Sequence, residues 1–208
     1  MEVRTKRELE IVLQQLEGYR NPKPELEQCP TPASLAAAMI HMSRMFGDLE
    51  GRRVADLGCG NGVLAIGSVL YGASEAVGID IDPEAVEIAR MNAERLGLSG
   101  RVRFLVMDVR DFSERVDTVV QNPPFGTRRR HMDTLFLEVA LRNSKVTYSL
   151  HMAGNSEFLR RFALERGASL THVERWPFPL ERVFPYHRRR VVRIPVELLR
   201  FEVMRHEG

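Results

Sequence analysis

The sequence has 208 residues, with 30 basic and 28 acidic side chains and 44% hydrophobic residues. This length suits one domain with a full hydrophobic core, and no apolar run is long enough to cross a membrane. The charged beginning argues against a secretory leader, so we expect a cytoplasmic protein. Two cysteines, Cys29 and Cys59, are too few for a disulfide framework or a zinc site, and we expect no bound metal.

The sequence pattern of residues 1–48 predicts a helical extension before the core of the domain. Apolar residues at helical spacing predict an amphipathic helix over residues 5–16. Thr31 followed by Pro32 predicts an N-cap and the first position of a helix that reaches about Phe46. Gln28 and Thr31 would then lie at a helix start, where backbone N–H groups favour the carboxylate of a cofactor. Both residues could instead be plain capping residues.

The core of the domain is expected over residues 49–208. Strands are expected over residues 53–57, 75–79, 101–107, 116–121 and 145–150, and helices over 62–71, 83–97, 132–143 and 155–166. This alternation predicts an α/β fold with a doubly wound, mainly parallel sheet. Two late apolar runs, 169–178 and 191–203, have no helix between them and predict a final antiparallel pair.

A glycine-rich loop follows the first of these strands. Gly58, Gly60 and Gly62 alternate between the strand and the next helix, where glycine permits positive φ and close approach of a ligand. Asp80 ends the second strand, 22 residues after Gly58, and its carboxylate can accept hydrogen bonds from both hydroxyls of a ribose. These features predict a nucleoside-containing cofactor.

A nicotinamide dinucleotide is the alternative to S-adenosylmethionine. The dinucleotide motif spaces its glycines as G-x-G-x-x-G, whereas this loop has G-x-G-x-G after Asp56. An acidic residue repels a diphosphate but suits the ammonium and sulfonium groups of S-adenosylmethionine, which we therefore favour. Asp108, after the third strand, could accept from the adenine amino group of that cofactor or could cap the turn into Asp111.

The motif Asn122-Pro123-Pro124-Phe125 follows the fourth strand, where open α/β sheets bind ligands. The amide oxygen of Asn122 and the carbonyl of Pro123 can accept both hydrogens of an aromatic amine, while Phe125 offers a stacking surface. Such acceptors make an exocyclic nitrogen nucleophilic, so catalysis would need orientation and electrostatics but no Cys or Ser nucleophile. A Pro-Pro turn that only closes a strand is the alternative.

Charge is distributed unevenly along the chain. Residues 1–120 carry 14 basic and 19 acidic side chains, whereas residues 121–208 carry 16 basic and 9 acidic ones. Two basic clusters lie in the second half: Arg128, Arg129 and Arg130, and His187, Arg188, Arg189 and Arg190. We expect them to form a positive surface for RNA phosphates. The alternative is that these arginines only make the surface soluble.

Five segments of the chain resemble the methyltransferase-like protein 5 family. They are residues 26–32, 55–64, 122–127, 148–151 and 187–190. The resemblance implies a class I S-adenosylmethionine-dependent methyltransferase with a Rossmann-like, seven-stranded sheet that methylates adenine N6 in small-subunit ribosomal RNA. It also implies a small zinc-binding activator protein as partner. Departures are Cys29, where an aromatic residue is common, and Asn61, where a Cys can occur.

The resemblance implies two sets of site residues. The cofactor would be bound by Gln28, Thr31, Gly58, Asn61, Val63, Asp80, Asp108 and Val109. The target adenine would contact Asn122, Pro123 and Phe125. The strand over 101–107 should be an apolar sheet edge, where we expect the activator to add a strand.

Two other functions stay open. A related Asn-Pro-Pro-aromatic site would also methylate a protein glutamine or a DNA adenine. A non-catalytic ribosome-assembly factor that holds the cofactor for stability is the third reading.

Overall fold

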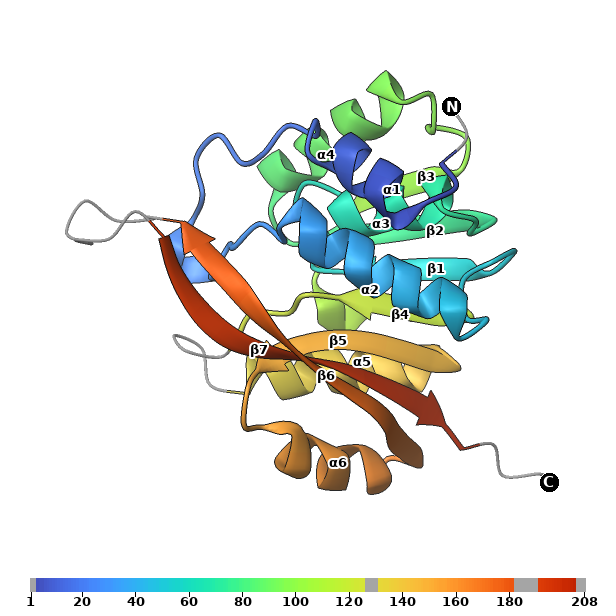
Figure 1. Ribbon diagram of the computed structural model, residues 1–208, viewed down its shortest axis with the longest axis vertical. Coiled ribbons are helices and arrows are strands. Elements are labelled where there is room, and N and C mark those ends of the chain that lie inside the picture. The colour runs from blue at the N-terminus through green and yellow to red at the C-terminus, as the bar shows by residue number, and fades with distance from the viewer. Residues whose placement is uncertain (1–2, 126–130, 182–190, 205–208) are drawn as a thin grey trace.

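The structure, a computed structural model, describes residues 3–125, 131–181 and 191–204. Its centre is a seven-stranded sheet in the order β3-β2-β1-β4-β5-β7-β6 (Figure 1). The strands are β1 (Arg53–Leu57), β2 (Glu75–Asp80), β3 (Val102–Val106), β4 (Thr118–Gln121), β5 (Val146–Met152), β6 (Ala168–Glu181) and β7 (Val191–Val203). The first five are parallel, and β7 runs antiparallel to both β5 and β6. The doubly wound sheet with a final antiparallel pair is thereby confirmed.

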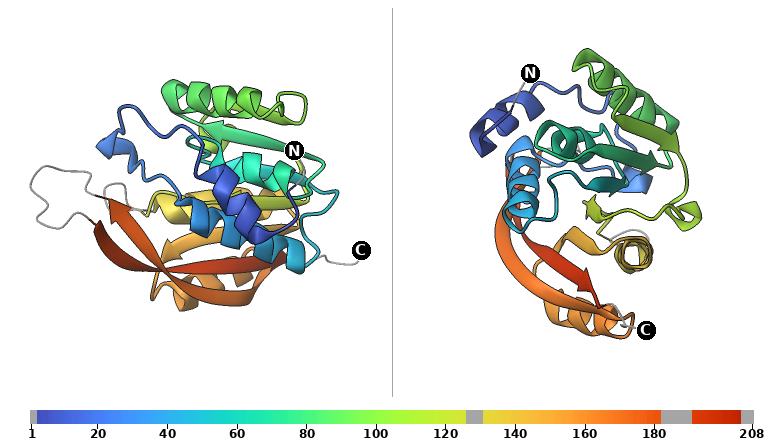
Figure 2. Two further views of the ribbon diagram at one scale, coloured as in Figure 1. Left: turned by 45° about the horizontal axis from the view of Figure 1, so that its top comes forward. Right: turned by 90° about the vertical axis from the view of Figure 1, so that its right-hand side faces the viewer.

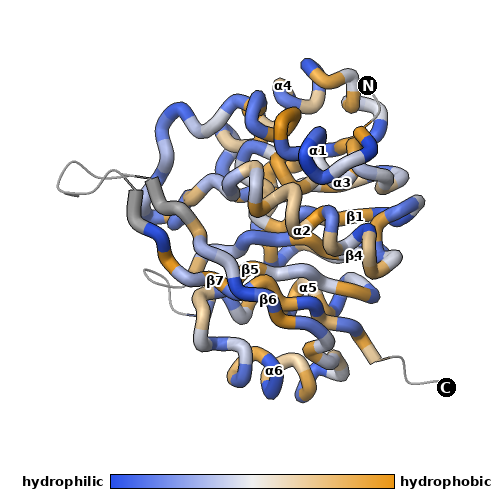
Figure 3. Tube along the Cα trace, viewed as in Figure 1, coloured by the Kyte–Doolittle hydropathy of each residue, from blue (hydrophilic) through white to orange (hydrophobic). Residues whose placement is uncertain are grey.

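Helices cover both faces of this sheet (Figure 2). They are α1 (Lys6–Leu13), α2 (Ala33–Met45), α3 (Val63–Leu70), α4 (Pro83–Arg95), α5 (Met132–Asn143) and α6 (Ser156–Leu164), with short 3-10 turns η1 (Pro24–Leu26) and η2 (Val109–Asp111). Alternate strand residues point to opposite faces, so Val54 belongs to the hydrophobic cluster that contains residues of α1–α4, while Ala55 belongs to the cluster that contains residues of α5. Hydrophobic residues gather along β1 and β4 in the middle of the sheet (Figure 3). Among the described residues, no helix has both the length and the apolar character to cross a bilayer.

The N-terminal helices begin and end differently from the prediction. Helix α1 has a capping box between Thr5 and Glu8 and ends at Leu13, earlier than expected. The N-cap of α2 is Pro32, and no side chain caps this helix, so the prediction that Thr31 caps it was wrong. The hydroxyl of Thr31 instead contacts a side chain at the end of β4. The Thr31 hydroxyl is therefore not used to cap α2.

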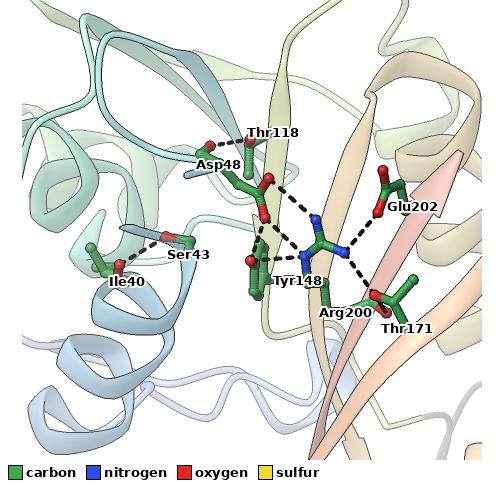
Figure 4. A network of polar contacts seen from close by, with 8 residues as sticks. All are labelled: Ile40, Ser43, Asp48, Thr118, Tyr148, Thr171, Arg200 and Glu202. Atoms are coloured by element: carbon green, nitrogen blue, oxygen red, sulfur yellow. Dashed lines mark hydrogen bonds and ion pairs between the residues drawn. The ribbon is translucent and has the colours of Figure 1, made fainter. Parts of the chain in front are cut away.

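A buried polar network joins the loop after α2 to the last strands of the sheet (Figure 4). The guanidinium of Arg200 on β7 lies 2.9 Å from Oδ2 of Asp48 and 3.0 Å from the Glu202 carboxylate. The Tyr148 hydroxyl donates to Asp48, and Thr171 Oγ1 accepts from Arg200 at 2.7 Å. Since the side chains of Arg200 and Asp48 are only 9% and 12% exposed, the pair is shielded from water. It holds the antiparallel strands against the parallel part of the sheet.

Removing the buried carboxylate should destabilise the protein strongly. We expect Asp48→Ala to lower the free energy of unfolding by about 3 kcal/mol, because it leaves the Arg200 charge without its shielded partner. The Glu202 side chain is 54% exposed, so Glu202→Ala should cost less than about 1 kcal/mol. Chemical denaturation of the two variants makes this comparison. Equal losses would show that Asp48 has no special role.

Candidate active site

One cavity lies at the carboxyl ends of the parallel strands. It is lined by the segment between α1 and α2, the glycine loop, the residues after β2, β3 and β4, and the start of α5. Thirteen of the predicted site residues line it: Gln28, Thr31, Gly58, Gly60, Asn61, Val63, Asp80, Asp108, Val109, Asn122, Pro123, Pro124 and Phe125. The topology thus brings both predicted halves of the site together. Asp56 and Gly62 lie outside this lining.

The glycine loop is shaped by its backbone and by neighbouring aromatic rings. Gly58, Gly60 and Gly62 all have positive φ, at 72°, 53° and 83°. A Cβ on Gly60 would meet the hydroxyl of Tyr19, and one on Gly62 would meet the Phe104 ring. Backbone conformation and packing therefore already require glycine at these positions, before any ligand is considered.

Asp80 ends β2 inside the cavity. Its Oδ2 accepts from the Gly60 amide and its Oδ1 from the Asp82 amide, both at 2.9 Å. Burial raises the pKa of this carboxyl above its usual value, while these two amides act against that shift. Each oxygen keeps a further lone pair, so a ribose diol could donate to both. The donor set fits the nucleoside part of S-adenosylmethionine.

Asp56 lies behind the glycine loop and does not face the cavity. Its Oδ2 accepts from the Ala65 amide of α3 at 3.1 Å, while Oδ1 has no partner among the described residues. Burial raises the pKa of Asp56 to about 8, and the nearby Asp80 charge adds to the shift. Its predicted direct interaction with the charged groups of a cofactor is therefore not seen; the side chain anchors the start of α3.

The N-terminal segment, defined here as residues 17–31, forms one wall of the cavity. The Gln28 amide donates to Asp82 at 2.6 Å and accepts from the Lys23 amide at 2.7 Å, so both ends are engaged inside the protein. Asn61 donates to the Glu17 carbonyl at 3.1 Å. Both amides, predicted to contact the cofactor, tie this segment to α4 and the glycine loop.

Asp108 follows β3 and caps the turn η2. Its carboxylate accepts from the Arg110 amide and from the Arg110 guanidinium, each at 2.9 Å. Of the two roles left open for Asp108, capping is the one seen in the structure. The residue still lines the cavity next to Val109, which is buried.

Asn122 directly follows β4, and a hydrogen bond orients its side-chain amide. Its Nδ2 donates to Thr31 Oγ1 at 3.0 Å, whereas Oδ1 is buried and has no partner among the described residues. Phe125 packs edge-on against Phe178 of β6, with ring centroids 6.1 Å apart and planes at 82°. An acceptor atom and an aromatic ring are therefore held at the same cavity, as predicted for binding an aromatic amine.

His151 on β5 cannot act as a general base for a ligand. It is buried inside the strand, where Nε2 lies 2.7 Å from Ser149 Oγ, which in turn accepts from Gln121. Burial lowers the pKa of His151 to about 3, so the ring stays neutral. Its contacts stabilise the β4–β5 interface.

Sequence reasoning missed Tyr19 and Asp82. Tyr19 packs on the loop at Gly60 and lines the cavity, and burial raises the pKa of its phenol. Asp82 caps α4 and binds Lys23 and Gln28. The pair Asp82-Pro83 carries a helix-start signal that could have located this residue. The predicted RNA-binding residues, Arg128–Arg130 and His187–Arg190, lie outside the described residues.

The buried Asp56 carboxyl should make stability fall with rising pH. The pKa is 3.8 in the unfolded chain and about 8 in the folded protein, so between these values only the folded state keeps the proton. The free energy of unfolding should therefore decrease by up to about 1.4 kcal/mol per pH unit between about pH 5 and pH 8, and level off above. Asp56→Asn should show a shallower slope than the parent in chemical denaturation without cofactor, because the Asp80 carboxyl, whose pKa burial also raises, still titrates.

Asp117→Asn provides the matched control. A hydrogen bond from Lys145 lowers the pKa of Asp117, so its titration lies below this pH window. Its profile should run parallel to that of the parent. A parallel profile for Asp56→Asn would contradict the raised pKa.

Comparison with known proteins identifies the family. Residues 35–123 match the model of the ribosomal protein L11 methyltransferase PrmA. The chain is 39% identical over 204 residues to the rRNA N(6)-adenosine-methyltransferase Mettl5 of Drosophila melanogaster, covering 95% of this chain and 96% of that protein. The Danio rerio METTL5 is 34% identical over 202 residues, with 94% and 97% covered. The crystal structure of PH1948 from Pyrococcus horikoshii superposes with a TM-score of 0.90 at 39% identity, covering 99% of this chain and 100% of that chain.

The likeness to these relatives extends over nearly the whole chain, and it confirms the resemblance seen in the sequence. The chain belongs to the METTL5 family of S-adenosylmethionine-dependent rRNA N(6)-adenosine methyltransferases.

Proposed function

We propose that the protein transfers the methyl group of S-adenosylmethionine to N6 of an adenine in small-subunit ribosomal RNA, in the cytoplasm. The observation that carries the proposal is the buried Oδ1 of Asn122, an acceptor without a partner among the described residues, on a residue that lines the same cavity as Asp80. A buried acceptor without a donor costs free energy, and an incoming amine would offset that cost. The family membership supports the same reaction.

The residues of the chain have separate roles in this proposal. Asp80 would accept from the ribose hydroxyls, and the glycine loop would let the cofactor approach the backbone. S-Adenosylmethionine supplies an electrophilic methyl carbon. Asn122 Oδ1 and the Pro123 carbonyl would accept from the adenine amino group, so that its lone pair is free for attack while Phe125 stacks on the base.

Bond formation and bond breaking balance without a protein base. With S-adenosylmethionine bound, a bond from N6 to the methyl carbon would form as the bond from that carbon to sulfur breaks, and the electron pair of the broken bond would stay on the sulfur. The nitrogen then loses a proton through its hydrogen-bonded acceptors to water. The buried, neutral His151 is not needed, because positioning and electrostatics supply the catalysis.

The RNA acceptor is favoured over a protein acceptor. The PrmA match covers residues 35–123, from within α2 to just after β4. The METTL5 relatives match nearly the whole chain, including the basic second half. We propose that Arg128–Arg130 and His187–Arg190 bind the phosphates around the target adenine.

Two substitutions should separate acceptor and cofactor roles. Asn122→Ala should lower kcat for methyl transfer to small-subunit ribosomal RNA at least about 100-fold, because an electrostatic contact to the reacting amine is lost. Its affinity for S-adenosylmethionine should stay close to that of the parent. Asp80→Ala should weaken cofactor binding about 10-fold or more, since charge-assisted hydrogen bonds to the ribose disappear.

Radiolabelled transfer, followed by nucleoside analysis for N6-methyladenosine, measures the first effect, and calorimetry measures the second. Parental activity of Asn122→Ala would overturn the acceptor site. Label in protein or DNA instead of RNA would support the alternative acceptors. If the parent transferred no label to RNA even with its activator, the assembly-factor reading would replace the proposal.

We also propose that β3 docks the zinc-binding activator. The two sheet edges differ in their free backbone groups. On β6, Pro177 and Pro179 stand at the outward-facing positions, because the paired Pro195 turns its carbonyl to Ala153 on the β5 side. Proline has no N–H, so this edge offers fewer donors to another strand.

The β3 edge is more open. Its Val106 side chain is 50% exposed, and the outward N–H and carbonyl of Val106 have no partner in the described part of the chain. The Phe104 carbonyl is covered by Arg90, at 2.8 Å, and the Phe104 ring is buried under the glycine loop. A partner strand would therefore pair near the carboxyl end of β3. A charge at Phe104 would disturb the fold, which makes Val106 the better test position.

Val106→Pro removes one outward donor from β3 without removing a hydrogen bond to β2. We expect it to weaken co-purification with the activator about 10-fold or more, because strand addition depends on main-chain hydrogen bonds. Val106→Ala, which keeps the N–H, should bind like the parent. Thermal unfolding of both variants controls for the fold. Unchanged capture by Val106→Pro would contradict docking on this edge.

A further inference from the structure

We propose that Thr31, together with the backbone carbonyl of Cys29, is a positioning group that sets the rotation of the catalytic Asn122 amide. The inference rests on the proposed function, because it assigns Asn122 Oδ1 to the target amine. It gives Thr31 a role other than the cofactor contact that the family resemblance implies.

The contacts determine which end of the amide faces the N-terminal segment. Asn122 Nδ2 lies 3.0 Å from Thr31 Oγ1 and 3.5 Å from the Cys29 carbonyl oxygen. A carbonyl can only accept a hydrogen bond, so the end facing it must be the NH₂ group. The opposite end, Oδ1, is then left as the buried acceptor without a partner among the described residues.

The rotation matters because an amide has a donor end and an acceptor end. If the amide turned by half a revolution, its NH₂ group would face the amino group of the target base, and donor would meet donor. At the same time Oδ1 would face the Cys29 carbonyl, which is repulsive. Thr31 and Cys29 thus select the one rotation in which Asn122 can accept from a substrate.

Prolines hold both partners of this contact in place. Thr31 lies between Pro30 and Pro32, and Asn122 precedes Pro123. A residue before proline is restricted to extended backbone conformations, and the β-branched Thr side chain has few rotamers. The Thr31 hydroxyl makes no cap on α2, so it is available to Asn122.

The N-terminal segment is also anchored at a second place. The Lys23 ammonium lies 2.5 Å from Asp82 Oδ1, and the Gln28 amide donates to Asp82 Oδ2 at 2.6 Å. Asp82 is 3% exposed, so the carboxylate of this anchor is shielded from water, while the Lys23 side chain is 36% exposed. The loop that carries Cys29 and Thr31 is therefore fixed to the start of α4, and Asn122 is positioned against a rigid partner.

Thr31→Val tests the proposal, because valine keeps the shape of threonine and lacks the hydroxyl. With cofactor saturating, we expect kcat for transfer to ribosomal RNA to fall about 10- to 100-fold, because the reacting groups lose their orientation. The dissociation constant of S-adenosylmethionine, measured by calorimetry, should stay within about 3-fold of the parent value. Thr31→Ser restores the hydroxyl and should recover kcat to within about 3-fold of the parent.

Thr118→Val is the matched control, since it removes a threonine hydrogen bond, to the Asp48 carbonyl, at the opposite end of β4. It should keep the parental kcat, which separates positioning from a general loss of stability. Unchanged kcat of Thr31→Val would overturn the inference, and so would weakened cofactor binding with unchanged kcat. Failure of Thr31→Ser to recover kcat would overturn it as well. Inactivity of the parent toward RNA would instead defeat the proposed function, independently of Thr31.

Discussion

The parallel arrangement of β1, β2 and β4 is the constraint on which the site depends. Adjacent parallel strands bring their carboxyl ends to one edge of the sheet, so the glycine loop, Asp80 and Asn122 meet although they are far apart in the chain. The buried Arg200–Asp48 pair contributes indirectly, because it fixes the antiparallel strands whose Phe178 packs against Phe125. A single sheet thus supports both the cofactor side and the acceptor side of the cavity.

Much of this arrangement could be predicted from local patterns. Apolar periodicity located the strands and helices, and the strand ends located Asp80 and Asn122, because both patterns reflect contacts between near neighbours. The glycine loop was predicted because its glycines suit a bound ligand, whereas in the structure packing within the protein also requires them. Its glycines accommodate Tyr19 and Phe104 as well as positive φ, and such long-range packing leaves no local signal in a sequence.

Polar side chains with two possible partners were the hardest to assign. Thr31, Gln28, Asn61 and Asp108 all line the cavity as expected, yet their described contacts are with other groups of the protein, which for Asp108 is its own turn. Short polar residues before a helix satisfy a cap or a distant side chain equally well, and the chain alone does not say which. Asp56 was misassigned because strand alternation points it at α3 and away from the cavity.

Phe104 connects the glycine loop to the sheet edge at β3. Its ring lies against Gly62 and Gly78, while its backbone belongs to the outermost parallel strand. A partner that stabilises β3 would therefore also stabilise the position of the Phe104 ring against the glycine loop. Thermodynamic linkage is reciprocal, so if a protein bound along β3 changed the affinity of the cavity for a nucleoside, the nucleoside would change the affinity for that protein by the same factor, with one aromatic side chain between the two sites.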